Sequence, residues 1–335
     1  MAIFRCNKCE YLREVSKDYI GKRVRCPECR KITQVFDTTT YVSALLSKYK
    51  EQKETLELLQ SDSAKDSAQV GDISRDEGAL FDDVDLHNTN ILAQEANLEP
   101  LAKWFDKREI NAVFDPDAAD TAGFFDEIAL KLGDDFEMLS CVSNQIKYVQ
   151  SKGYKNVKLD VSNKTAKEIQ GINSFCKELY EYSFVAKHFY EKKDQVIRLT
   201  LQTAPRIRRF FDGLWMEWFT LIKLLYLFQD TKIAPACTRS LRVSFKGGKS
   251  NELDIFVLSS AGVPVCIECK SGEFRHDIEK YLDLRKRLGI SKRQFIVCVF
   301  GLSNEQAAGM TSMYDLTFAN QSSVVDCVAD ALREP

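Results

Sequence analysis

The stretch from Asn251 to Gly272 reads NELDIFVLSSAGVPVCIECKSG and predicts two β-strands joined by a turn. Leu253–Ser259 and Val263–Lys270 are rich in Ile, Val, Leu and Phe, and the residues between them, ending at Gly262, are typical of a turn. Both runs are apolar at nearly every position, which is typical of a sheet covered on both faces. We therefore expect a buried β-hairpin.

Three charged side chains interrupt this apolar pattern: Asp254, Glu268 and Lys270. Because side chains alternate across a strand, Glu268 and Lys270 share one face, whereas Ile267 and Cys269 point to the other. A buried unpaired charge is costly, so the three groups must pair, bind a cation or line a cleft. Two carboxylates on adjacent strand ends suit one or two Mg²⁺ ions, and a nearby lysine can orient or deprotonate a water or neutralise charge on a phosphate. A purely structural ion cluster at a sheet edge is the alternative.

The pattern D-x(n)-E-x-K resembles that of the PD-(D/E)XK nuclease superfamily, with Leu253 where the motif's name has proline. The resemblance implies an α/β restriction-endonuclease-like core, in which helices flank a mixed sheet. It also implies that Asp254, Glu268 and Lys270 are catalytic and that the two carboxylates bind Mg²⁺ or Mn²⁺. The carbonyl group of Cys269 is a further metal ligand by the same resemblance.

The segments around the hairpin fit the same core. The run GLWMEWFTLIKLLYLF at Gly213–Phe228 is apolar almost all round and predicts a buried helix. Glu217 is its one carboxylate, which the resemblance makes catalytic and a metal ligand. With a first strand at Leu241–Lys246, a polar helix at about Arg275–Leu288 and a strand at Gln294–Phe300, the order becomes helix, strand, strand, strand, helix, strand, as in the superfamily.

Over about residues 205–300, the pairing of GLWMEW with NELD and IECKSG is most similar to the nuclease half of CRISPR-ancillary effectors, which carry a nucleotide-sensing domain. The resemblance implies a metal-dependent endonuclease acting on nucleic acid, with DNA the expected substrate, in prokaryotic defence or DNA processing. Because an ungated nuclease is hazardous to a cell, we expect a partner protein or small-molecule activator. The alternatives are a catalytically inactive nuclease fold that binds nucleic acid as a regulator, and a scaffold whose acidic cluster is structural.

The charge balance limits how nucleic acid could bind. The 335 residues carry a formal net charge of −2, which excludes a uniformly basic coat, so attraction to phosphate must be local. No apolar run reaches about 18 residues and no apolar signal core opens the chain, so we expect no membrane span and a cytoplasmic location. The candidate phosphate-binding residues, which could equally be solvated surface charges, are Arg206, Arg208, Arg209, Arg242 and Lys246.

Four of the eleven cysteines form two closely spaced pairs. Cys6-x2-Cys9 and Cys26-x2-Cys29, separated by sixteen residues, match the two knuckles of a tetrahedral Cys₄ zinc site and resemble a bacterial zinc ribbon. Four cysteines leave no open coordination position, so this zinc is expected to be structural. The ribbon is locally basic, and contact with phosphate or with a protein is open.

Changes in composition divide the chain into five parts. We expect a zinc ribbon at 1–38, a helix at 39–61, a flexible acidic linker at 62–87, an α+β middle domain at 88–204 and the nuclease domain at 205–335. The helix has a short coiled-coil seam, for which packing on its own protein and homodimerisation are both open.

The middle domain is predicted to contain three helices and a hairpin. Amphipathic patterns place helices at 124–132 and 136–151, and the capping box Thr165-x-x-Glu168 opens a third. Two alternating strands follow around 192–194. This order is the outline of a winged helix, although other small α+β domains share it.

Overall fold

The structure, a computed structural model, describes residues 2–5, 12–20, 22–27, 30–37, 92, 95–115, 124–231, 235–248 and 250–333. The chain divides into two compact units, residues 1–75 and 76–335. The helix predicted at 39–61 lies outside the described residues, as does the predicted linker up to residue 87.

The first unit contains an antiparallel four-stranded sheet in the order β2-β1-β4-β3, with bounds β1 Ala2–Arg5, β2 Leu12–Val15, β3 Arg23–Arg25 and β4 Ile32–Asp37. Cys26 is buried in its small core. The backbone N–H of Arg30 donates to the Cys26 carbonyl at 3.0 Å, and Arg30 has the left-handed φ of 61° that a tight turn requires. Cys6, Cys9 and Cys29 lie outside the described residues, so the zinc site stays a prediction.

The second unit is built on a mixed six-stranded sheet in the order β13-β12-β11-β10-β9-β5. The predicted hairpin is confirmed as the antiparallel pair β10–β11, and β11, β12 and β13 run parallel to one another. The predicted order of helix, three strands, helix and strand is also confirmed. The bounds are β5 Asn111–Val113, β9 Ala236–Ser244, β10 Ser250–Leu258, β11 Pro264–Ser271, β12 Phe295–Phe300 and β13 Thr317–Ala319.

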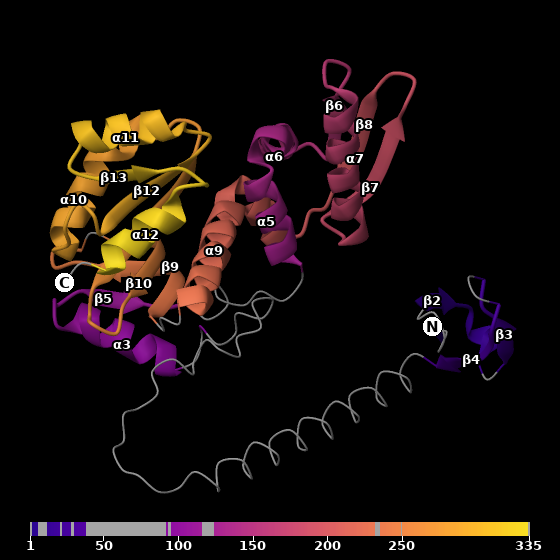
Figure 1. Cartoon of the computed structure of the whole chain (residues 1–335), viewed down its shortest axis with the longest axis horizontal. Coiled ribbons are helices and arrows are strands. Elements are labelled where there is room, and N and C mark those ends of the chain that lie inside the picture. The colour runs from indigo at the N-terminus through magenta and orange to yellow at the C-terminus, as the bar shows by residue number, and fades with distance from the viewer. Residues whose placement is uncertain are drawn as a thin grey trace, which may run out of the picture. The chain divides into compact units, whose positions relative to one another are not determined.

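Helices cover both faces of this sheet (Figure 1). On one face lie α9 (Trp215–Thr231) and α12 (Val324–Arg333); on the other lie α3 (Glu95–Asp106), α10 (Ile278–Leu288) and α11 (Asn304–Met313). The predicted burial of α9 is confirmed, because Leu221, Leu224 and Leu225 have no exposed surface. A side chain at Gly133 of α5 (Phe125–Asp134) would overlap the ring of Phe219, so α5 approaches α9 very closely.

The segment before α9 contains the three predicted helices and the predicted hairpin, all confirmed. The capping box is also confirmed, with the Glu168 N–H donating to Thr165 Oγ1 at 3.3 Å and the Thr165 N–H donating to Glu168 Oε2 at 2.9 Å. The strand β6 was not predicted, and it extends the hairpin to a three-stranded sheet in the order β6-β8-β7. The bounds are α6 Phe136–Ser151, β6 Asn156–Asp160, α7 Ala166–Glu181, β7 Val185–Glu191 and β8 Val196–Leu201.

The predicted domain boundaries and the winged-helix assignment stay predictions. The second compact unit includes both the middle segment and the six-stranded sheet. Moreover, two elements of the predicted middle domain belong with that sheet: α3 packs against it, and β5 is its edge strand.

A short basic helix, α8 (Pro205–Arg209), leads into α9 through one wider turn, η3 (Phe210–Leu214). Gly213 has a φ of 147°, which side-chain-bearing residues rarely adopt, and the chain bends there. Helix α9 therefore begins at Trp215, two residues later than predicted, with Glu217 in its first turn. None of the helices in the described ranges is long and apolar enough to cross a bilayer.

Candidate functional site

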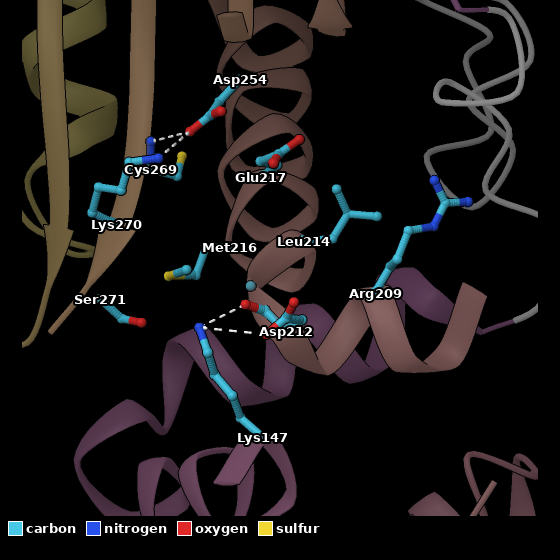
Figure 2. Close-up of a pocket in the computed structure, with 11 residues that line it drawn as sticks. Lys147, Arg209, Asp212, Leu214, Met216, Glu217, Asp254, Cys269, Lys270 and Ser271 are labelled. Atoms are coloured by element: carbon cyan, nitrogen blue, oxygen red, sulfur yellow. Dashed lines mark hydrogen bonds and ion pairs between the residues drawn. The ribbon is translucent and has the colours of Figure 1, made fainter. Parts of the chain in front are cut away.

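A cavity of about 360 Å³ lies where the C-terminal end of β11 meets the start of α9. Figure 2 shows its side chains, with Asp254, Glu217 and Lys270 at one end and Lys147 at the other. The lining residues that carry charge or polarity are Lys147, Arg209, Asp212, Glu217, Asp254, Lys270 and Ser271. The structure thus brings three of the four predicted catalytic residues to one cavity wall, and Glu268 lies beside Lys270.

β10 is irregular at Asp254, where its side chains switch faces of the sheet, and this directs the Asp254 carboxylate into the cavity. Leu253 packs in the core on the α3 and α10 face of the sheet, whereas Ile255 packs in the core on the α9 face. Residues two apart on a regular strand share a face, so the strand twists at Asp254. The neighbouring ladder pairs place Ser240 opposite Asp254, and Ser240 has a φ of 53°. Both strands are therefore irregular at the position where the carboxylate is needed.

Lys270 contacts both hairpin carboxylates. Its Nζ lies 3.6 Å from Asp254 Oδ2 and 3.9 Å from Glu268 Oε2. The backbone N–H of Cys269 donates to Asp254 Oδ2 at 2.7 Å, while the Cys269 thiol lies 3.5 Å from Thr220 Oγ1 on α9. Asp254 and Glu268 are thus close enough to share one cation, and here that cation is the lysine ammonium.

Glu217 joins the group from the helix side. Its Oε2 accepts a hydrogen bond from Ser240 Oγ at 3.0 Å and lies 3.9 Å from an Nη atom of Arg239. Arg239 itself is only 2% exposed, and its guanidinium lies 3.7 Å from the centre of the Trp218 ring. Glu217 therefore stands between the hairpin carboxylates and a buried arginine.

Burial raises the pKa of all three carboxyl groups. Burial and then the Asp254 charge raise the pKa of Glu217 to about 8 and hold the pKa of Glu268 well above its usual value. The pKa of Asp254 is also raised, mainly by burial. Burial opposes the charged form of Lys270, but Asp254 and Glu268 hold its pKa above the usual value. Additional positive charge in this cavity would be strongly stabilised.

The donor atoms fit a hard divalent cation, although the side chains are not gathered around a metal position. In the described part of the chain, no group of three or more His, Cys, Asp or Glu side chains is arranged to hold a metal ion. Glu268 is 1% exposed, however, and its Oε1 has no hydrogen-bond partner among the described residues. A buried carboxylate oxygen without a donor is costly, and carboxylate oxygens are the ligands that Mg²⁺ prefers.

The predicted phosphate-binding residues separate into three groups. Arg209 lines this cavity and also a second one, which Arg206 and Arg242 line as well. Arg208 lines neither of these and faces a different cavity near the end of α6. Lys246 forms an ion pair with Glu109 and lines neither of the first two cavities.

Two charged residues at the site were not assigned to it from the sequence. Lys147, on α6, donates to the backbone carbonyl of Asp212 at 2.7 Å and reaches the cavity from the middle segment. Arg239 is buried in the sheet beside Glu217. The strand ACTRSLRV mixes polar and apolar residues, so no local signal marks Arg239 as buried, and none marks Lys147.

No protein-family model matches this chain, and no curated protein matches it. Among solved structures, it is similar to protein VC1899 from Vibrio cholerae, at 17% identity and a TM-score of 0.49, over 70% of this chain and 60% of that one. It is also similar to Can2 from Sulfobacillus thermosulfidooxidans, solved with cyclic tetra-adenylate, at 13% identity and a TM-score of 0.48, over 70% of this chain and 61% of that one. The chain spans about three fifths of the length of each. TM-scores below 0.5 do not establish a shared fold.

Proposed function

We propose that this protein is a metal-dependent endonuclease that hydrolyses phosphodiester bonds, with DNA the substrate expected from the sequence. The observation that supports this most directly is the convergence of Glu217, Asp254 and Glu268 with one ammonium group, that of Lys270, at the end of a buried sheet. Burial raises the pKa values of all three carboxyl groups, and buried titratable groups beside a cavity are typical of functional sites.

Each residue has a distinct role in this proposal. Asp254 and Glu268 would hold Mg²⁺ or Mn²⁺, with Glu217 and the Cys269 carbonyl group as the further ligands that the sequence suggests. The hydrogen bond from the Cys269 N–H to Asp254 Oδ2 fixes that carboxylate against β11. Ser240 and Arg239 fix Glu217 from the other side.

Lys270 would act directly on the substrate. Its ammonium is cationic at neutral pH and 30% of its side chain is exposed, so it can meet a phosphate oxygen or orient the attacking water. When bound, the metal ion would supply an activated water and neutralise charge on the leaving oxygen.

Cleavage assays with matched variants test the proposal. Purified protein is incubated with circular, linear and single-stranded DNA and with RNA, with and without Mg²⁺ or Mn²⁺. Asp254→Asn keeps the shape of the side chain and Lys270→Met keeps most of its length, and each is expected to lower metal-dependent cleavage by at least about 100-fold. Exposed residues of the same types supply the controls Asp106→Asn and Lys286→Met, which should cleave normally.

The unfolding temperature with and without Mn²⁺ is a second readout, which tests metal binding even in an enzyme that is inactive until an activator binds. Mn²⁺ should raise the unfolding temperature of the wild-type protein, because a ligand that binds only the folded state stabilises it. Asp254→Asn should lose that shift, whereas Lys270→Met should keep it, since it removes a competing cation and no ligand. Cleavage retained by both variants, or a Mn²⁺ shift unaffected by Asp254→Asn, would refute the assignment.

A further inference from the structure

We call the cavity that Glu217, Asp254 and Lys270 line the carboxylate cavity. A second and larger cavity, of about 670 Å³, lies beside it. We call it the arginine cavity, because four arginines from two elements line it: Arg206 and Arg209 from α8, and Arg239 and Arg242 from β9. Two carboxylates, those of Asp115 and Glu252, also line it. Its walls therefore carry more positive than negative charge, in a protein whose overall charge is slightly negative.

One wall of the arginine cavity is held rigidly. The guanidinium of Arg239 stacks on Trp218, and Trp218 lies nearly parallel to Phe125, with ring centres 5.9 Å apart. Arg206 lies over Phe125, 5.4 Å from its ring centre. Stacking on these aromatic rings holds the planar guanidinium groups in place.

The two cavities adjoin at Glu217. Its carboxylate faces Asp254 in the first cavity and contacts Arg239 and Ser240, which line the second. Arg209 and Leu214 line both cavities, and Figure 2 shows the Arg209 guanidinium pointing away from Asp254 and Lys270. A chain molecule with repeating charge could therefore occupy both cavities at once.

We propose that the arginine cavity binds the phosphate group next to the scissile one on the same substrate strand. The substrate is then an oligonucleotide strand and not an isolated phosphodiester. This inference rests on the proposed function for the position of the scissile phosphate. In this proposal the arginine cavity anchors the strand, and Arg206 and Arg242 are the exposed cations of that cavity.

The charges of the two cavities favour such an anchor. At the end of the carboxylate cavity formed by Glu217, Asp254 and Lys270, acidic groups outnumber the one ammonium, so this end gives a phosphodiester little net attraction. Lys147 lines the other end, and the four arginines of the adjoining cavity supply further attraction beside Glu217. A cavity of this volume accommodates a nucleotide-sized group.

Binding measured without turnover tests the inference. A short fluorescein-labelled single strand, of DNA in one series and RNA in the other, is titrated with protein in the presence of EDTA, and fluorescence anisotropy is followed. Arg206→Ala and Arg242→Ala should each weaken binding about tenfold, because each removes a charged hydrogen-bond donor to phosphate. Each should also reduce the slope of log affinity against log salt by about 0.7.

Arg208→Ala is the matched control, because Arg208 lies on the same short helix as Arg206 but lines a different cavity. It should leave the affinity and the salt slope close to those of the wild-type protein. Equal losses in all three variants, or a wild-type protein that binds neither strand, would overturn the inference. If the strand binds as expected but Asp254→Asn leaves the Mn²⁺ shift of the unfolding temperature unchanged, the proposed function fails and the anchoring site stands.

Discussion

Replacing Glu217 with glutamine should change how the stability of this protein depends on pH. Glutamine keeps the size of the side chain and an oxygen that can accept the hydrogen bond from Ser240 Oγ, but it removes the titrating group. In the wild-type protein, burial and Asp254 raise the pKa of Glu217 from its usual 4.5 to about 8. The folded protein therefore holds a proton at Glu217 over a pH range in which the unfolded chain has lost it.

The sign and size of the effect follow from this difference. Stability falls with rising pH wherever the folded state binds more protons than the unfolded state, so the contribution of Glu217 is full below pH 4.5 and is lost by about pH 8. The pKa difference corresponds to a loss on the order of 4 kcal/mol in the free energy of unfolding across that range. Asp254 and Glu268 act in the same direction, because their pKa values are also raised.

Urea unfolding in EDTA at intervals between pH 5 and pH 8 measures this dependence. The wild-type free energy of unfolding should fall steeply over the range, and that of Glu217→Gln should fall much less. Glu137→Gln, at an exposed position on α6, should show the wild-type slope. Mn²⁺ should raise the free energy of unfolding of the wild-type protein most at pH 8, where its carboxyl groups are most nearly ionised. A wild-type slope that is flat, or unchanged in Glu217→Gln, would contradict the electrostatic picture of the site.

Two further predictions concern the fold. Gly133→Ala should lower the free energy of unfolding by at least about 2 kcal/mol, because the new methyl group overlaps the Phe219 ring. Gly309→Ala, in an open position on α11, should not destabilise the protein. Equal effects of the two variants in urea unfolding would count against the close packing of α5 on α9. The purified protein should contain one tightly bound zinc ion per chain by elemental analysis, and Cys26→Ser should lose it while Cys141→Ser, at a partly buried cysteine, keeps it; zinc retained in Cys26→Ser would refute the Cys₄ assignment.

The sequence by itself predicted the elements that carry their own local pattern. The hairpin β10–β11, the buried helix α9 and the strand β12 are long apolar runs, and the capping box at Thr165 is a contact between residues three apart. The charged residues of the hairpin stood out because each interrupts such a run. These features depend on neighbouring residues, so sequence alone is sufficient to find them.

Two short strands were missed. β5 has three residues and β6 has five, and each is a strand only because it pairs with a distant partner, β9 and β8 respectively. β9 begins at Ala236, five residues earlier than predicted. The polar residues Thr238, Arg239 and Ser240 gave its start no apolar pattern, although Thr238 and Arg239 are buried.

Only the tertiary structure decided how the site is put together. It placed Glu217 between Asp254 and the buried guanidinium of Arg239, brought Lys147 from α6 to the same cavity, and separated Arg206 from Arg208 although they lie two residues apart. The physical reason is that these relations arise from a twist at Ser240 and Asp254 and a bend at Gly213, whose directions are set by packing between segments far apart in the chain. Residue type determines which chemistry is available, and the packing of distant segments determines which groups meet.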